Sequence, residues 1–324
     1  MSFHLIVPEG FDDPARPSGG NHYDRRLAGP ALSVATVAGS RLDCALAAVP
    51  DGEPALIDGL IASGSAAVLG AHARRLSPVV LMHMPLFCPG EQEVLAAAAG
   101  VITTSAWTRD QLLARYPLDP DRVRIACPGA DPAPLASGTP GGGSLLCVAA
   151  VAPHKGQDLL IAALDQLSTW DWSCRCAGSV TVDPGFAAGL RHDRVEFTGV
   201  LAGTALERAY ADADVLLVPS RAETYGMVVT EALARGVPVL AAEVGGLPEA
   251  LGYAPGGTRP GRLFAPEDPA ALAAAIRGWL GDPAERCRLR AAARARRTAL
   301  PGWEPTVTAV TAAMLDFAAV GAEL

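Results

Sequence analysis

Residues 214 to 249 constrain the fold of this chain more than any other stretch. They read DVLLVPSRAETYGMVVTEALARGVPVLAAEVGGLPE. The short aliphatic run 215–218 is typical of a buried parallel strand, and Pro219 and Ser220 end it. A turn, a helical pattern from about Met227 and a second apolar run follow. This order predicts a strand–helix–strand unit, which requires a parallel sheet with helices on its faces.

Two carboxylates mark this unit, Glu223 in the turn and Glu231 about one turn inside the helix. In an open α/β sheet, ligands bind beyond the carboxyl ends of the strands, where the start of a helix offers N–H groups and partial positive charge to a phosphate. Carboxylates would repel a phosphate, so we expect these two to bind sugar or ribose hydroxyls. Gly226 allows the backbone to approach a ligand closely.

The motif Glu223-Thr-Tyr-Gly-Met-Val-Val-Thr-Glu231, with Gly-Gly-Leu-Pro-Glu at 245–249, resembles the E-x7-E signature of retaining GT-B glycosyltransferases of family four, the glycosyl transferases group 1. The resemblance covers most of the second half of the chain closely and the first half in outline. It implies that Glu223 contacts the transferred sugar, that Glu231 binds the nucleotide ribose, and that the amides between them hold the diphosphate. The alternative is an ordinary strand–helix–strand unit with surface carboxylates.

Lys155 is the single lysine among 26 basic residues. A chain that uses Arg wherever a generic cation suffices is expected to keep Lys where a compact ammonium is needed. The strand predicted over 144–151 and the Lys155-Gly156 pair resemble the family element that binds the donor diphosphate. That element also has an arginine, which Ala150 replaces here. The loss costs about 1.5–3 kcal/mol unless Arg221 or His154 compensates.

Short apolar runs, expected to be strands over 3–8, 32–38, 54–61 and 78–83 among others, alternate with helical patterns through the first 126 residues. This alternation predicts a doubly wound parallel sheet. The resemblance places the pair Gly19 and Gly20, after the first strand, near the donor phosphates and the acceptor. It also assigns to His83, which ends the strand 78–83, contact with the sugar near the reacting carbon. A turn or linker would explain the glycines equally, and an ordinary satisfied polar side chain would explain the histidine.

Two weaker motifs lie in the second half. Thr198 and Gly199 match the place where the family's backbone contacts the nucleobase, although turn chemistry explains them as well. Asp212-Ala-Asp214 looks like a D-x-D metal motif, but it precedes a buried strand instead of following one. We therefore interpret it as a helix terminus and expect no metal site.

The clearest linker is the stretch 131–143, which is rich in Pro, Gly and Ser and has no apolar periodicity. It predicts an N-terminal domain over 1–135 and a nucleotide-sugar-binding domain over 144–302. The resemblance implies that the last helix, about 303–320, returns to the first domain. The alternative is that this helix packs only on its own, second domain. The expected fold is α/β GT-B, two doubly wound Rossmann-like domains facing a cleft.

Composition limits the partners. A net charge of −8 and a pI near 5.3 disfavour nucleic acid and anionic lipid. No run of 18 apolar residues and no basic-then-apolar N-terminus is present, so no transmembrane segment is expected. The seven scattered cysteines fit reduced thiols in a cytoplasmic protein. Either a monomer or a homodimer is compatible with the sequence.

These features predict a retaining, metal-independent glycosyltransferase that moves a sugar from a nucleotide diphosphate sugar to a small-molecule acceptor, with no cofactor beyond that co-substrate. The rivals are a nucleotide-sugar epimerase on the same fold and a non-catalytic binding scaffold. The candidate catalytic residues are His83, Lys155 and Glu223. The candidate donor-binding residues are Gly19, Gly20, Lys155, Arg221, Thr224, Tyr225, Gly226, Met227, Val228 and Glu231.

Overall fold

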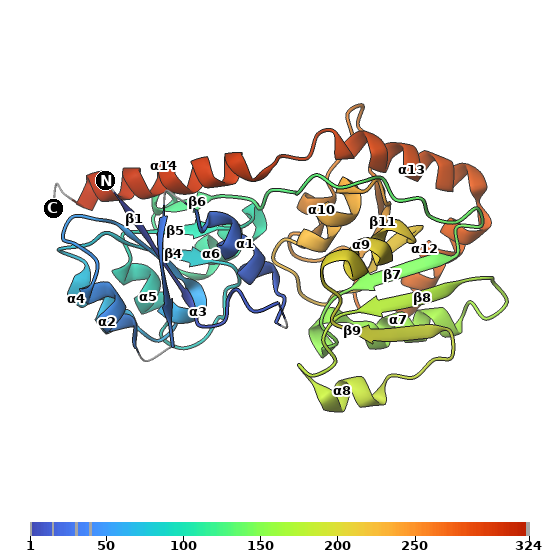
Figure 1. Cartoon of the computed structure of the whole chain (residues 1–324), viewed down its shortest axis with the longest axis horizontal. Helices are drawn as coiled ribbons and strands as arrows, with labels where there is room; N and C mark the ends of the chain where they lie inside the picture. Colours follow the sequence, from blue (N-terminus) through green and yellow to red (C-terminus); the bar gives the residue numbers. More distant parts are fainter. Residues whose placement is uncertain (1, 15, 30–31, 39–40, 322–324) are drawn as a thin grey trace. The chain divides into compact units, whose positions relative to one another are not determined.

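The apolar runs of the sequence become two sheets of six parallel strands each. The computed structural model describes residues 2–14, 16–29, 32–38 and 41–321. The chain divides into two compact units, one of Met1–Gly129 with Trp303–Leu324 and one of Ala130–Gly302, and each unit holds one sheet (Figure 1). The predicted α/β class with two doubly wound parallel sheets is confirmed.

In the first unit the strand order is β2-β1-β3-β4-β5-β6. The strands are β1 (Phe3–Pro8), β2 (Leu32–Val37), β3 (Ala55–Asp58), β4 (Pro78–Met82), β5 (Gly100–Thr103) and β6 (Val123–Ile125). The helices are α1 (Gly19–Leu27), α2 (Leu42–Ala47), α3 (Gly59–Ala62), α4 (Ala66–His72), α5 (Glu91–Ala97), α6 (Ala106–Arg115), the 3-10 turn Pro120–Arg122 and α14 (Trp303–Gly321).

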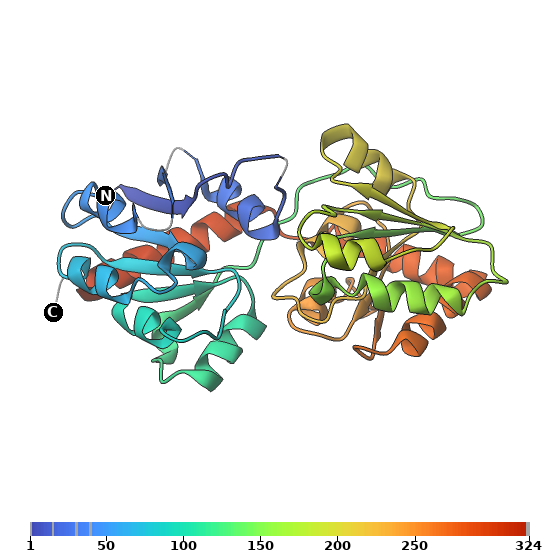
Figure 2. The same cartoon turned by 90° about the horizontal axis from the view of Figure 1, so that it is seen from below.

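Helices cover both faces of the first sheet, and its inner strands β3, β4 and β5 are buried on both sides (Figure 2). Leu5 packs with Tyr23 of α1 and Phe317 of α14 on one face, whereas Ile6 packs with the helices of the other face. Gly100 of β5 lies directly under Phe317, since a Cβ atom there would come within 2.3 Å of the ring. The last helix is therefore part of the core of the first unit.

In the second unit the strand order is β12-β11-β10-β7-β8-β9. The strands are β7 (Ser144–Val148), β8 (Ser173–Ala177), β9 (Val195–Gly199), β10 (Val215–Val218), β11 (Val239–Ala242) and β12 (Gly261–Phe264). The helices are the 3-10 turn Pro153–Lys155, α7 (Gln157–Asp165), α8 (Pro184–Gly189), α9 (Gly203–Ala211), α10 (Met227–Ala234), α11 (Leu247–Leu251), α12 (Pro269–Gly281) and α13 (Pro283–Arg297).

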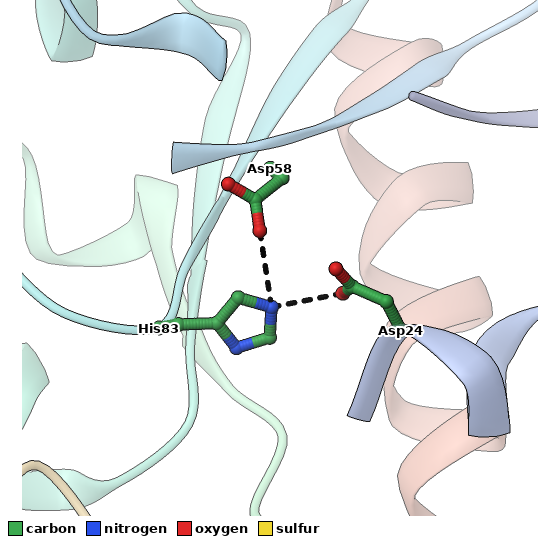
Figure 3. Close-up of side chains that lie close together, drawn as sticks. All are labelled: Asp24, Asp58 and His83. Carbon is green, nitrogen blue, oxygen red and sulfur yellow. Dashed lines mark hydrogen bonds and ion pairs between the residues drawn. The ribbon is translucent and has the colours of Figure 1, made fainter. Parts of the chain in front are cut away.

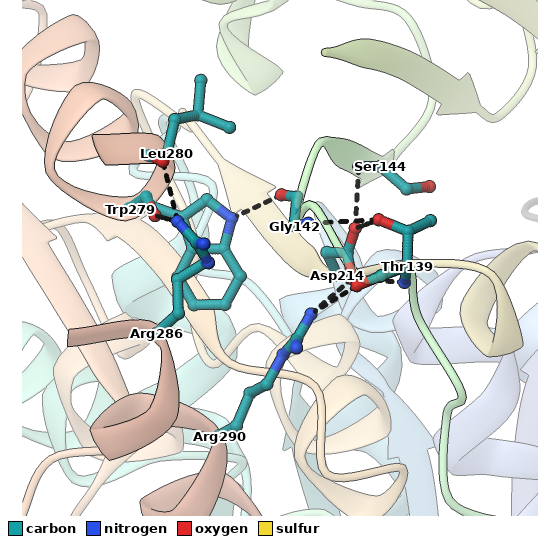
Figure 4. Close-up of polar contacts among 8 residues, drawn as sticks. All are labelled: Thr139, Gly142, Ser144, Asp214, Trp279, Leu280, Arg286 and Arg290. Carbon is teal, nitrogen blue, oxygen red and sulfur yellow. Dashed lines mark hydrogen bonds and ion pairs between the residues drawn. The ribbon is translucent and has the colours of Figure 1, made fainter. Parts of the chain in front are cut away.

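The stretch expected to be a linker, 131–143, lies within the second unit. Its anchor is the buried carboxylate of Asp214, which accepts hydrogen bonds from the backbone N–H and hydroxyl of Thr139, from the N–H of Ser144 and from Arg290 (Figure 4). The indole N–H of Trp279 donates to the carbonyl of Gly142 at 2.8 Å. The Asp212-Ala-Asp214 motif therefore has a structural use, with Asp214 fully committed to protein donors.

The apolar run expected to be a strand over 54–61 divides into two elements. β3 ends at Asp58, and α3 begins at Gly59. The cause is local, since Oδ1 of Asp58 accepts a hydrogen bond from the N–H of Leu60 at 2.6 Å and so caps the short helix.

None of the helices in the described ranges has the length and apolarity needed to cross a membrane.

Candidate functional site

In the second unit the strand order reverses between β7 and β10, which are neighbours in the sheet although β8 and β9 lie between them in sequence. Ligands of doubly wound sheets bind beyond the carboxyl ends of the strands at such a switch point. The loops that follow β7 and β10 are joined there, because the carbonyl of His154 accepts a hydrogen bond from the N–H of Arg221 at 2.8 Å.

Lys155 and Glu223 meet across these two loops. Nζ of Lys155 donates to Oε2 of Glu223 at 2.7 Å, and both side chains remain partly exposed. Gly156 makes the approach possible, since it has φ +71° and a Cβ atom there would lie 2.1 Å from the carbonyl oxygen of Pro219. Burial and the Lys155 charge lower the pKa of His154, so this imidazole adds no cation at neutral pH.

Glu231 lies in the second turn of α10 and is tied to α9. The hydroxyl of Tyr210 donates to Oε2 of Glu231 at 2.8 Å. Tyr210 is fully buried, and burial together with the Glu231 charge raises the pKa of its phenol well above the usual value. This hydrogen bond holds the half-buried Glu231 in one orientation through its Oε2 atom.

The turn between the two carboxylates is shaped by glycines. Gly226, with φ +94°, precedes α10, and a Cβ atom there would lie 2.5 Å from Cδ2 of Leu247. Gly246 donates its N–H to the carbonyl of Glu223 at 3.0 Å, which holds the Gly-Gly segment against the turn. Among the predicted donor-binding residues of this segment, Tyr225 and Gly226 are buried. Thr224, Met227 and Val228 are half-buried.

Arg221 is engaged by protein groups. Its two terminal nitrogens donate to both carboxylate oxygens of Asp158 at 2.8 and 2.7 Å, and this bidentate contact lowers the pKa of Asp158. In this arrangement the guanidinium braces the loop that carries Lys155. Ala150 instead offers its backbone carbonyl to Nε2 of Gln157 at 3.0 Å.

Thr198 and Gly199 end β9, the edge strand of the second sheet. One strand, β8, separates β9 from β7. The hydroxyl of Thr198 donates to the carbonyl of Gly199 at 2.9 Å, a local turn contact. These two residues therefore lie at the same sheet edge as Lys155 but beside the switch point.

The first unit has its own switch point, between β1 and β3, and three polar side chains converge there (Figure 3). Nε2 of His83 lies 2.8 Å from Oδ1 of Asp24 and 3.5 Å from Oδ2 of Asp58. Asp24 and Asp58 are buried, and His83 follows β4. Gly20 borders the ring, since a Cβ atom there would lie 3.3 Å from Cδ2 of His83.

Burial and charge compete in this cluster. Burial alone would lower the pKa of His83, but the Asp24 charge and hydrogen bond and the Asp58 charge raise it overall. Burial raises the pKa of Asp58 to about 6. The charge of His83 acts to lower this pKa, whereas the charge of Asp24 raises it further. The nitrogen and the carboxylate oxygens lie within 4.8 Å of one another, so they could also ligate a metal ion.

Three residues of these sites were missed in the sequence. Asp58 stood inside the run expected to be a strand, although an Asp before Gly at the end of an apolar run is a signal for a strand's carboxyl edge. Asp24 lies four residues after Gly20 and so shares a face of α1 with it. Tyr210 meets Glu231 only through the packing of α9 and α10, and no local pattern indicates the contact.

Comparison with known proteins gives one family match. The profile of the family described as Glycosyl transferases group 1 matches residues 142–282. The match covers the switch point of the second unit, with Lys155, Glu223 and Glu231. Those residues therefore belong to the part of the chain that the family shares.

Two relatives that bear the same name are similar to this chain over about two thirds of its length. D-inositol 3-phosphate glycosyltransferase of Frankia alni is 34% identical over 247 residues, 68% of this chain and 60% of that protein. The protein of the same name from Kineococcus radiotolerans is 36% identical over 251 residues, 68% of this chain and 58% of that protein. The chain thus spans about 60% of the length of these relatives.

Solved structures show the same fold at low sequence identity. Sucrose-phosphate synthase from Thermosynechococcus elongatus has a TM-score of 0.74 and 21% identity, and the alignment covers 98% of this chain and 99% of that one. Anabaena HepE in complex with UDP and glucose has a TM-score of 0.75 and 16% identity, with 96% and 98% covered. These similarities concern the arrangement of the backbone.

Proposed function

Because residues 142–282 form a glycosyl transferases group 1 domain within a chain of the GT-B fold, we propose that this protein is a retaining glycosyltransferase that uses a nucleotide diphosphate sugar. The observation that carries the proposal is the contact between Lys155 and Glu223 at the switch point, with Glu231 held in the next helix. One cation and two carboxylates there suit a ligand that combines phosphates with hydroxyls.

In the proposed reaction, Lys155 and the start of α10 stabilise the negative charge that grows on the leaving diphosphate. Such electrostatic stabilisation is often the largest contribution to catalysis. Glu231 binds the ribose, and Glu223 and His83 orient the sugar through its hydroxyls. The departing phosphate takes the proton of the acceptor hydroxyl on the same face of the sugar, so no protein nucleophile and no metal ion is required.

The acceptor is proposed to be a small molecule. D-inositol 3-phosphate belongs in any panel of acceptors because the two relatives carry that name. An epimerase on the same fold and a binding scaffold without turnover remain the rivals. Ala150, at the place of the family's phosphate-binding arginine, favours the scaffold, and the commitment of Arg221 to Asp158 adds to that argument.

The test is to incubate the purified chain with UDP-glucose, UDP-N-acetylglucosamine and GDP-mannose, with and without acceptors, and to measure nucleotide release. We expect nucleotide release that depends on the acceptor. NMR of the product should show that the anomeric configuration of the sugar is retained. Binding without release would support the scaffold. A changed sugar without an acceptor would support the epimerase, and added EDTA tests the independence from metal.

A further inference from the structure

The His83 ring is fixed along one side. Its Nε2 atom faces both Asp24 and Asp58, and its Cδ2 edge lies against Gly20 (Figure 3). Tyr23 approaches at 5.2 Å between ring centroids in an edge-to-face arrangement. In the part of the chain that the structure describes, Nδ1 of His83 has no hydrogen-bond partner and points away from both carboxylates (Figure 3). The remaining edge, with Nδ1, is where a ligand can reach the ring.

We propose that Asp24 and Asp58 are positioning residues that lock the His83 ring with Nε2–H turned inward, so that Nδ1 contacts an uncharged hydroxyl of the transferred sugar. The inference rests on the proposed function for the identity of the sugar. The locking itself follows from two facts: the 2.8 Å contact between Asp24 and His83, and the complete burial of Asp24.

The charges in the cluster favour a hydroxyl over a phosphate. An imidazolium beside two carboxylates has a net negative charge, and protonation of Asp58, whose pKa is about 6, brings it only to neutrality. The cluster therefore never attracts an anion through its net charge. A hydroxyl can accept from a protonated Nδ1 and donate to an unprotonated one, whereas an ionised phosphate can only accept.

Asp24 and Asp58 differ in what else they hold. Oδ1 of Asp58 also caps α3 through the N–H of Leu60, so only Oδ2 faces His83. Oδ2 of Asp24 is buried and accepts no hydrogen bond from any of the residues that the structure describes. A buried carboxylate with an unsatisfied oxygen is costly, so its position is explained by the contact that its other oxygen makes. We expect Asp24 to dominate the orientation of the ring.

The experiment is a titration of ¹⁵N-histidine-labelled protein by long-range ¹H–¹⁵N NMR, with His83→Gln to identify the signal. In the wild type, Nε2 should remain protonated, and UDP-glucose or GDP-mannose should shift the Nδ1 signal whereas UDP, GDP or inorganic phosphate should not. In Asp24→Asn the pKa of His83 should fall, because an anion is removed. Turnover should drop about tenfold or more, with a smaller change in the donor KM.

Asp43→Asn is the matched control, because Oδ1 of Asp43 lies 2.8 Å from Nε2 of His72, the same distance in the same unit. It should change the His72 signal and leave turnover unchanged. Asp58→Asn is the second variant, with a smaller loss expected, and thermal melting of each variant checks folding. If the wild type turns over no nucleotide sugar, the proposed function fails, but the His83 signal in Asp24→Asn still decides the locking.

Three results would overturn the inference. The first is a His83 tautomer and pKa that do not change in Asp24→Asn. The second is a shift of Nδ1 caused by inorganic phosphate alone. The third is stoichiometric Zn²⁺ that survives dialysis of the wild type and is lost in Asp24→Asn, which would make the three side chains metal ligands.

Discussion

Nζ of Lys155 lies 2.7 Å from Oε2 of Glu223, and this ion pair joins the loops that follow β7 and β10. Each side chain is only partly exposed, at 21% and 16%, so each charge has lost part of its hydration and depends on the other. A diphosphate ligand would compete with Glu223 for the ammonium. The pair therefore keeps Lys155 pointed into the switch point of the second sheet.

Replacing Lys155 by Ala should reduce kcat/KM for nucleotide release by about tenfold or more. The change removes a charge-assisted contact to phosphate, which contributes about 1.5–3 kcal/mol. Steady-state kinetics with the active nucleotide sugar measure it. Arg175→Ala is the control, since Arg175 forms an exposed pair with Glu196 in the same unit. Unchanged kinetics in Lys155→Ala would remove Lys155 from the site.

Glu231→Ala should weaken nucleotide binding more than the variant Tyr210→Phe does. The first variant removes the proposed ribose ligand, whereas the second removes only the hydroxyl that orients it. Both variants should lower the free energy of unfolding. Glu231→Ala should cost about 1–3 kcal/mol, because the buried Tyr210 hydroxyl loses its acceptor, and Tyr210→Phe should cost about 0.5–1.5 kcal/mol. Calorimetric titration with the nucleotide gives the affinities. Wild-type affinity in Glu231→Ala would contradict the ribose assignment.

The sequence was most informative where local chemistry determines the structure. Apolar runs bounded by Gly, Pro and Ser predicted strands such as β4 and β10, because a strand buried on both faces must be apolar throughout. The E-x7-E motif placed Glu223 in a turn and Glu231 in a helix, and the structure has them there. The function of these residues remains a prediction.

Contacts between distant residues could not be predicted in the same way. Asp214 binds Thr139, 75 positions away, so the Gly-rich stretch looked like a linker although it is held by a buried carboxylate. Asp24 meets His83, 59 positions away. A single sequence contains no signal for either contact, because both depend on how helices and loops pack against the folded sheet.

Asp214→Ala should destabilise the second unit strongly, and Asp212→Ala should not. Asp214 is fully buried and its loss leaves Arg290 and two backbone N–H groups without their acceptor. Breaking a buried ion pair costs about 3 kcal/mol or more, so the melting temperature should fall by roughly 6–12 °C in calorimetry. Asp212 is exposed and serves as the matched control. Restoration of stability by Mn²⁺ would instead show that the motif binds metal.

Gly20→Ala should reduce turnover without reducing stability. Gly20 lies in the first turn of α1 with ordinary helical geometry, so a methyl group is compatible with the backbone and slightly favours the helix. The same methyl group would lie 3.3 Å from Cδ2 of His83 and displace the ring by a few tenths of an ångström from Asp24. Gly70→Ala in α4 is the control, since a Cβ atom there has no atom within 4 Å. We expect kcat to fall in Gly20→Ala only, while both variants melt at or above the wild-type temperature. Equal kcat in Gly20→Ala and the wild type would show that the position of the His83 ring does not limit the reaction.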